Sequence, residues 1–541
     1  MSTITNLLCN NFGGIRQKNA VFSSELITAQ DMQNVELYYT GLNGGVGIRT
    51  AKGNVSIDDS LVGTEKIINI FQSIQKEITY CFIHTESETE GKLYLYNLSS
   101  KVFTLKKDGL SVTGNSNGMD IAQGWSDLFF FTNGAEMLTV ELNKTDEEGN
   151  LDEIKMMNLK DRDDRDIVGI NAALFAGRLW IFNKNILWYS AVANIYDFST
   201  ADGEWQTSAG YIETIKNITA IYPYLGSLAI FYEDSSELLS ENDGAFSRSQ
   251  ESPGGCAGCN SLVFHDTNLY FYDHTKKSVF SFKQVISGEK TLGENVAIDI
   301  QEELKNIDSD LLNKIKTLSV FLEGRNEIWW LIPSTDESYS TILIFDYLKG
   351  EWIKRKSQKI NSMQIVGHTL YSAGNNGKIL EEYNSNLFDG EYIQHYYNCS
   401  PMNLGANNTL KILVFQPRVS LDLPYTNRFY VKYVKNYNLF KKPKVKLIKT
   451  KYKNFLYWDI GFWDINYWFA NRTSNIGKFP NATFKILEIS IYTTNKDEDF
   501  SIKNIEFSKI KVKQVWFGFL FQKIKISILN NAKSYIKSIK N

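Results

Sequence analysis

Two cysteines, Cys256 and Cys259, are separated by two residues, a spacing found in zinc sites and in redox-active dithiols. A zinc site needs a second pair of Cys or His ligands at a matching spacing, and no such pair follows. A redox-active dithiol needs a helix N-terminus to lower the thiol pKa, whereas Pro253-Gly254-Gly255 predicts a turn that leads into a strand. We therefore interpret this cysteine pair as part of a structural loop.

The other residue types used in catalysis form no catalytic pattern. The five histidines are never two or four residues apart, and the HExxH, GxSxG, phosphate-loop and dinucleotide motifs are absent from the sequence. Residues 199–205 resemble the Asp-box turn of sialidases only loosely, and the acidic stretches 145–149 and 161–166 lack EF-hand spacing. We therefore expect a protein that is not an enzyme, with no catalytic, metal-binding or cofactor-binding residues and no cofactor.

A cluster of lysines lies in the C-terminal part of the chain. Seven lysines fall in a short window that also holds Tyr452 and Phe455; they are Lys441, Lys442, Lys444, Lys446, Lys449, Lys451 and Lys453. Such a cluster would bind a phosphate backbone without sequence specificity and with strong salt dependence. We predict that these lysines face DNA or an acidic protein partner.

The charge is divided unevenly along the chain. Residues 427–541 contain 21 Lys and 2 Arg against 7 acidic residues, a net charge of +16, so residues 1–426 carry −19 within a total of −3. This asymmetry favours an anionic partner for the C-terminal part, and a solvated lysine-rich surface is the alternative interpretation.

A short apolar and aromatic tetrad recurs through most of the sequence. The seven tetrads begin at Ile78, Leu128, Leu179, Leu228, Leu269, Ile328 and Leu370, which are 50, 51, 49, 41, 59 and 42 residues apart. After five of them a second short strand is legible, at residues 92–96, 137–140, 186–190, 278–282 and 341–345. A unit of roughly 40 to 50 residues built from short strands is the size of a propeller blade.

These patterns predict an all-β protein: a β-propeller of six or seven blades followed by a β-sandwich-like C-terminal domain. We expect residues 1–64 to be an N-terminal extension that joins the propeller, residues 65–398 to be the propeller, and residues 399–541 to be a basic β-rich domain. Val35, Leu37 and Tyr39 alternate with polar residues, which predicts a strand that enters the ring. Apolar residues between Ile300 and Leu318 fall at helical spacing and predict one helix between two blades.

Composition is consistent with a globular β protein. The chain of 541 residues is 43% hydrophobic and 13% aromatic, enough for a packed core rich in strands. Its five cysteines are too few and too scattered for a disulfide framework, which indicates synthesis in a reducing compartment. No secretory signal is visible at the N-terminus, and we expect no membrane-spanning segment because the longest notable apolar run, 515–521, is 7 residues.

Several stretches, taken in order, resemble a known family. Residues 13–15, 34–35 and 47–50 look like its opening, and 174–181 followed by 186–190 and 196–198 look like its most recognisable blade. Residues 224–231, the glycine turn at 254–258 and Asp389-Gly390 are similar to its later blades and to its exit from the propeller. The family is that of the propeller-bearing tail proteins of short-tailed phages, called packaged-DNA stabilisation, tail accessory or nozzle proteins; the likeness covers about residues 10–420.

The resemblance implies a virion protein, made in the host cytoplasm, that forms a ring of commonly about six copies around the DNA channel of the tail. Such a ring lies below the portal and adaptor, stabilises packaged DNA and supports its ejection. The partners implied are further copies of the chain, the portal or adaptor, other tail proteins and non-specifically bound DNA. A carbohydrate- or receptor-binding propeller and a glycan hydrolase are the alternatives.

Overall fold

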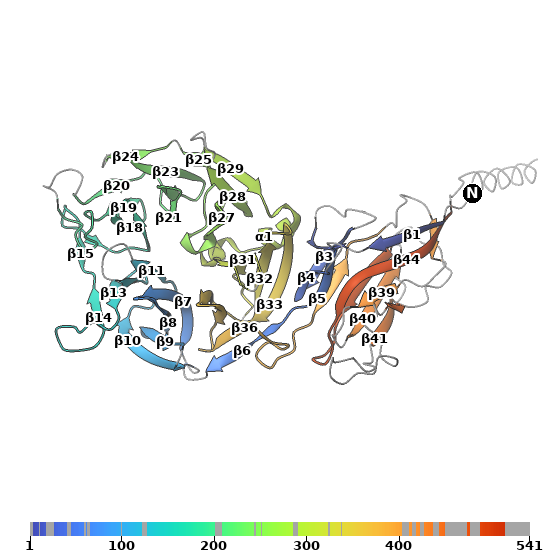
Figure 1. Ribbon diagram of the computed structural model, residues 1–541. Helices are drawn as coiled ribbons and strands as arrows, with labels where there is room; N and C mark the ends of the chain where they lie inside the picture. Colours follow the sequence, from blue (N-terminus) through green and yellow to red (C-terminus); the bar gives the residue numbers. More distant parts are fainter. Residues whose placement is uncertain are drawn as a thin grey trace, which may run out of the picture.

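The computed structural model contains a β-propeller and a separate curled β-sheet (Figure 1). It describes residues 4–9, 11–17, 26–40, 45–58, 61, 65–98, 100–121, 127–200, 208–242, 245–249, 251–284, 290–322, 325–336, 338–402, 410–413, 418–421, 427–435, 443–449, 473–475 and 487–513. Within these ranges no helix is both long and apolar enough to cross a membrane. The all-β prediction and the propeller are confirmed.

The propeller has seven blades, each a sheet of antiparallel strands. Six blades are built from consecutive strands, and the seventh takes its outer strand, β6, from the N-terminal part of the chain. The first three blades are β7(Lys66–Gln75), β8(Ile78–Glu86), β9(Gly91–Asn97) and β10(Val102–Leu110); β11(Asn117–Ile121), β12(Leu128–Thr132), β13(Met137–Glu141) and β14(Glu153–Met156); and β17(Asn171–Phe175), β18(Arg178–Asn183), β19(Ile186–Tyr189) and β20(Gly210–Glu213). The short pair β15(Leu159–Lys160) and β16(Asp166–Ile167) lies between the second and third blades in the chain.

The remaining four blades follow the same order. They are β21(Ala220–Tyr224), β22(Ser227–Phe231), β23(Ser235–Asn242) and β24(Ala245–Arg248), with β25(Ser252–Pro253); β26(Leu262–His265), β27(Asn268–Asp273), β28(Ser278–Gln284) and β29(Lys290–Asn295); β30(Lys316–Val320), β31(Glu327–Ile332), β32(Tyr339–Asp346) and β33(Glu351–Gln358); and β34(Ser362–Val366), β35(Thr369–Ala373), β36(Ile379–Ser385) and β6(Gly53–Asp58).

Every predicted tetrad lies in the second strand of a blade, and the predicted second strands are the third strands. Alternate residues of one strand pack against different neighbours, because successive side chains point to opposite faces. In β18, Leu179 and Ile181 join an apolar cluster with the second blade, whereas Trp180 and Phe182 join a cluster with the fourth. Each blade therefore needs a neighbour on both faces, which explains why its central strands read as continuous apolar runs.

The N-terminal segment differs from its expected place in the propeller. Only β6 joins the ring, as the outer strand of the seventh blade, where it pairs with β36. The strand predicted around Val35 belongs instead to the curled sheet, because β4 pairs with β5 and β5 pairs with β44. The Velcro-type closure is thus made about twenty residues later in the chain than the alternation at Val35, Leu37 and Tyr39 predicted.

The curled sheet combines both ends of the chain in 13 strands, so the expected sandwich takes the form of one sheet. Its strands are β1(Ile4–Cys9), β2(Asn11–Ile15), β3(Leu26–Gln33), β4(Val35–Tyr39), β5(Val46–Thr50), β37(Tyr396–Cys399), β38(Leu410–Leu413), β39(Arg418–Leu421), β40(Arg428–Lys435), β41(Lys444–Lys449), β42(Thr473–Asn475), β43(Leu487–Tyr492) and β44(Ser501–Lys513). The main path runs β41-β40-β43-β37-β3-β2-β5-β44-β39-β42.

The single helix predicted over Ile300–Leu318 is wrong. The segment forms the 3-10 turn η2(Ile298–Ile300), the short helix α1(Gln301–Lys305) and the 3-10 turn η3(Ser309–Lys314), and then enters β30. Asp308 is extended and caps η3 by accepting a hydrogen bond from the Asp310 backbone N–H, which interrupts any continuous helix. Ile300, Leu304, Ile307, Leu312 and Ile315 are buried, but pairing with β31 fixes residues 316–320 as a strand.

The curled sheet contacts the propeller at its sixth blade. The Asn34 backbone N–H donates to the Lys354 carbonyl at 2.9 Å, and its Oδ1 accepts from the Lys356 N–H at 2.8 Å. Gly14 of β2 lies so close to β33 that a Cβ atom would stand 2.2 Å from the Trp352 carbonyl oxygen. Its backbone N–H donates to Glu351 Oε2 at 2.9 Å.

We expect Gly14→Ala to lower the free energy of unfolding by about 1–3 kcal/mol, the usual cost of an added methyl group without space. Urea denaturation of the full chain measures this change. The control is Gly258→Ala, where the nearest atom would be 3.5 Å from the new Cβ and no comparable loss is expected. Equal stability of the two variants would contradict the close approach of β2 to β33.

Candidate functional site

The predicted lysine cluster is only partly placed. Lys444, Lys446 and Lys449 lie in β41, which pairs with β40 at the edge of the curled sheet. The Lys446 side chain is half-buried. Lys441, Lys442, Lys451 and Lys453 lie outside the described residues. Contact of these lysines with DNA or with an acidic partner stays a prediction.

The cysteine pair lies in a tight turn before β26, where Cys259 begins the 3-10 turn η1(Cys259–Ser261). The Cys256 thiol is 3.2 Å from both the Gly258 carbonyl and Ser261 Oγ. Burial raises the pKa of Cys256 to about 12, so this thiol is not ionised at neutral pH. Among the residues that the structure describes, no group of three His, Cys, Asp or Glu side chains is arranged to hold a metal ion.

A cluster of buried ion pairs lies where the curled sheet meets the propeller. Glu36 of β4 accepts from Arg49 Nε and Nη2 of β5 through Oε2, at 3.1 and 3.0 Å, and from Arg325 Nη2 through Oε1 at 3.0 Å. Arg325 lies just before β31 of the sixth blade and also pairs with Glu327 at 3.2 Å. One carboxylate therefore joins an arginine of the sheet to an arginine of the propeller.

The ionisation of Glu36 follows from these contacts. Burial by itself would raise the pKa of this carboxyl, but the charges and hydrogen bonds of Arg325 and Arg49 outweigh burial and lower the pKa. The carboxylate is thus ionised at neutral pH although Glu36 is only 9% exposed. A paired buried charge of this kind fixes the relative position of the elements that carry it.

A bulge in β36 directs Tyr383 into the same junction. The pairing of β36 with β6 shifts between Glu382 and Ser385, and Tyr383 has a φ of 65°, a conformation that costs energy for a bulky residue. The Arg325 guanidinium lies 3.7 Å from the centre of the Tyr383 ring, and the phenol donates to Glu327 at 3.2 Å. The strained backbone therefore supports a cation–π contact between the sixth and seventh blades.

A second buried pair lies beside this tyrosine. Arg355 of β33 donates to Glu382 of β36 at 2.5 Å and to the Lys52 carbonyl at 2.7 Å, in the segment that leads from the sheet into the propeller. Glu382 also accepts from Asn54 of β6 at 2.9 Å. Arg355 is 2% exposed, so this network ties the closing strand of the ring to the chain crossing.

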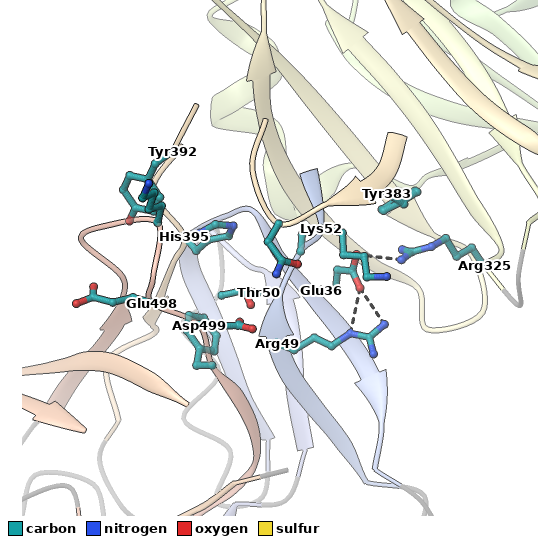
Figure 2. A pocket seen from close by; sticks show the side chains of 14 residues that line it. Glu36, Arg49, Thr50, Lys52, Arg325, Tyr383, Tyr392, His395, Glu498 and Asp499 are labelled. Carbon is teal, nitrogen blue, oxygen red and sulfur yellow. Dashed lines mark hydrogen bonds and ion pairs between the residues drawn. The ribbon is translucent and has the colours of Figure 1, made fainter. Parts of the chain in front are cut away.

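A polar cavity of about 230 Å³ opens next to the network (Figure 2). Arg325 and Tyr383 stand on its propeller side, and Thr50, His395 and Asp499 stand on its sheet side. The other lining residues are Glu36, Arg49, Ala51, Lys52, Asn386, Tyr392, Lys496, Glu498 and Phe500. The cavity is smaller than the roughly 300–1,000 Å³ of sites for drug-sized ligands.

Two lining groups have unsatisfied hydrogen-bonding atoms. His395 is 4% exposed, and its Nε2 has no partner among the described residues; neither has Asp499 Oδ1. Burial lowers the pKa of His395 to about 4 and raises the pKa of Asp499 to about 6. His395 is therefore neutral at pH 7, and Asp499 is a carboxylate held at a cost in stability.

Sequence reasoning did not find this cavity, because its residues come from four segments, around 36–52, 325, 383–395 and 496–500. No spacing rule connects them, since the ring of blades separates them in the chain. The one local signal was Glu36, a charge between the alternating apolar residues Val35 and Leu37.

Comparisons with known proteins identify no family for this chain. The chain matches no family model and no curated protein. Among solved structures it is similar to the N-terminal domain of Nup159, at 11% identity and a TM-score of 0.35, over 66% of this chain and 97% of that one. A protein from Lactobacillus plantarum is similar at 10% identity and a TM-score of 0.32, over 60% of this chain and 94% of that one.

We expect Asp499→Asn to stabilise the protein at pH 8 by about 1–2 kcal/mol, a value discounted for the partial exposure of this side chain. The pKa of Asp499 is higher in the folded protein than in the unfolded chain. The Asp499 carboxyl therefore contributes favourably to the free energy of unfolding below about pH 4, and this contribution is lost as the pH rises through about 6. Urea denaturation at pH 4 and pH 8 measures the difference. A variant less stable than wild type at pH 8 would contradict the unpaired burial of this carboxylate.

We expect Arg325→Met to lower the free energy of unfolding by about 3 kcal/mol, the lower end of the cost of breaking a buried ion pair, since Arg49 still faces Glu36. The double variant Arg325→Met/Glu36→Gln should recover part of this loss. Lys160→Met, which removes an exposed pair with Asp164, is the control and should have little effect.

Proposed function

We propose that this chain is a structural subunit of a phage virion tail that assembles as a ring around the DNA channel, stabilises packaged DNA and supports its ejection. The ordered motifs of residues 10–420 motivate the proposal. The structural observation that supports it best is a set of exposed apolar side chains along one edge of the propeller, described next. The ring would consist of commonly about six copies and would dock on the portal or adaptor.

Exposed apolar residues occupy turns that must lie on the same edge of the propeller. In a four-stranded antiparallel blade the first and third turns are at one end and the second turn is at the other. Leu225 and Phe321 lie in first turns of the fourth and sixth blades, and Leu151 and Leu348 lie in third turns of the second and sixth. The exposed fractions are 55% for Leu225, 76% for Phe321, 76% for Leu151 and 61% for Leu348. We infer that these side chains, which lie on one edge but on different blades, contact a second copy of the chain.

A contact between two blades indicates that DNA would pass between subunits and not through the centre of one propeller. Lys316 of β30 in the sixth blade donates to the Ile68 carbonyl of β7 in the first blade at 2.6 Å. This contact links the first strands of the two blades that flank the seventh blade, and we infer that it narrows the centre of the ring. A channel wide enough for a duplex would then be formed between subunits, as a homomeric ring provides.

The rigid junction also suits a component that bears force during ejection. The Glu36 and Arg355 networks hold the curled sheet and the closing strand of the propeller in one arrangement. A block in which both chain ends form one sheet presents two unlike faces to neighbouring copies, which a closed ring requires.

We expect Phe321→Asp/Leu348→Asp to convert the ring into monomers. Ile215→Asp is the matched control, since Ile215 is 97% exposed but lies in a connection between blades at the opposite edge. Light scattering after size exclusion and electron microscopy measure the assembly. A wild-type monomer at high concentration would contradict the ring, and a monomer that binds glycans would favour the carbohydrate- or receptor-binding alternative.

We expect the seven lysines to support salt-dependent DNA binding by the assembled protein. Replacing all seven with Gln should weaken binding and reduce its dependence on salt, because fewer counterions are released. An equal number of exposed propeller lysines, among them Lys101, Lys184 and Lys314, provides the control set. Fluorescence anisotropy with duplex DNA at several salt concentrations measures both quantities, and equal salt slopes for the two sets would remove these lysines from the interface.

A further inference from the structure

Some side chains that line the cavity at the junction have no ion-pair or hydrogen-bond partner, whereas others are paired within the protein. Glu36 is neutralised by Arg49 and Arg325. Glu498 is fully buried and accepts from the Thr494 backbone N–H and hydroxyl and from Asn495 Nδ2, at 2.6, 2.9 and 3.1 Å. These lining charges are satisfied within the protein.

The groups that remain are of two kinds. Lys52 and Lys496 are exposed at the rim, and no ion pair between described residues involves either of them. Deeper in the cavity, Asp499 Oδ1 and His395 Nε2 have no hydrogen-bond partner in the described chain. A complementary ligand therefore carries a negative group for the lysines and several hydrogen-bonding hydroxyl groups for Asp499 and His395.

His395 Nε2 and Asp499 Oδ1 are two of 21 buried side-chain atoms without a hydrogen-bond partner among the described residues, and they are the two that belong to residues lining this cavity. A buried polar atom without a partner costs about 1–3 kcal/mol unless water or a ligand satisfies it. Tyr392 lies beside His395, with ring centres 6.1 Å apart, and it offers an apolar surface next to the unpaired atoms. Figure 2 shows His395 and Asp499 on the same side of the cavity, across from Arg325.

We propose that this cavity binds an acidic monosaccharide, a sugar ring that carries one carboxylate. The carboxylate would pair with the lysines that line the cavity, Lys52 and Lys496, the ring hydroxyls would donate to Asp499 and exchange hydrogen bonds with His395, and a ring face would rest near Tyr392. A volume of about 230 Å³ suits one sugar ring rather than a drug-sized ligand. Arg325 shares its turn with Phe321, but Lys52, Lys496, His395 and Asp499, which would contact the ligand, lie outside the apolar turns.

The charges of Asp499, Lys52 and Lys496 determine which class of ligand the cavity accepts. A bare phosphate or carboxylate would meet Asp499 without a donor to offset the repulsion, whereas a hydroxyl group would supply one. A neutral sugar would satisfy Asp499 and His395 but leave both lysines without a partner. Only the combination of carboxylate and hydroxyl groups uses all four residues.

Calorimetric titration of the full chain with glucuronate tests the proposal, with glucose and acetate as comparison ligands. We expect glucuronate to bind at least about tenfold more tightly than either, as expected for added charge-assisted hydrogen bonds. Lys52→Gln/Lys496→Gln should reduce glucuronate binding to the level of glucose. Lys184→Gln/Lys314→Gln, two exposed lysines elsewhere on the propeller, should leave binding unchanged.

Asp499→Asn separates loss of binding from loss of folding, because this variant is expected to be at least as stable as wild type at pH 8 and yet to bind glucuronate more weakly. The proposal is overturned if no heat of binding is detected, if acetate binds as tightly as glucuronate, or if the two double lysine variants behave alike. The mass of the same sample, measured in parallel, reports on the ring, so the failure of one proposal is distinguishable from the failure of the other.

Discussion

Every blade of this propeller has two apolar faces, and the structure depends on covering both. Apolar clusters join neighbouring blades, such as the first and second around Phe82 and Phe129, whose rings stack with centres 4.2 Å apart. The largest cluster joins the fifth, sixth and seventh blades to the curled sheet. A linear stack would leave two faces exposed, so the ring must close. Closure by β6 brings residues 53–58 beside β36, and the rest of the N-terminal segment is then carried to the curled sheet.

Ring closure also creates the junction. The chain enters the propeller at residues 50–54 and leaves it after β36, so the two crossing segments lie side by side between the propeller and the sheet. Polar backbone groups in this region need partners, and the Lys52 carbonyl obtains one from Arg355. The paired charges of Glu36, Arg325 and Glu382 lie where the two segments that connect the propeller with the sheet would otherwise bury polar groups without partners.

The seven tetrads made the propeller predictable, because a central strand that is buried on both faces has apolar residues at successive positions. The same reasoning placed Val35 in the ring incorrectly, since alternation reports one buried face but does not identify the sheet that covers it. The same reasoning also predicted one helix over Ile300–Leu318, because two 3-10 turns followed by a strand place apolar residues at a spacing close to that of a helix. The cavity was not predictable, because Arg325, His395 and Asp499 meet only after the ring and the sheet are both complete.

The junction combines charges that stabilise the fold with charges that weaken it. The pKa of Glu36 is lowered by two arginines, so its carboxylate favours folding above the range of acid denaturation. Asp499, a short distance along the same cavity, has its pKa raised by burial, so its ionisation opposes folding at neutral pH. A chain under selection for stability alone would replace Asp499 with Asn at little structural cost, whereas a chain that binds a hydroxyl-bearing ligand there retains the stronger acceptor.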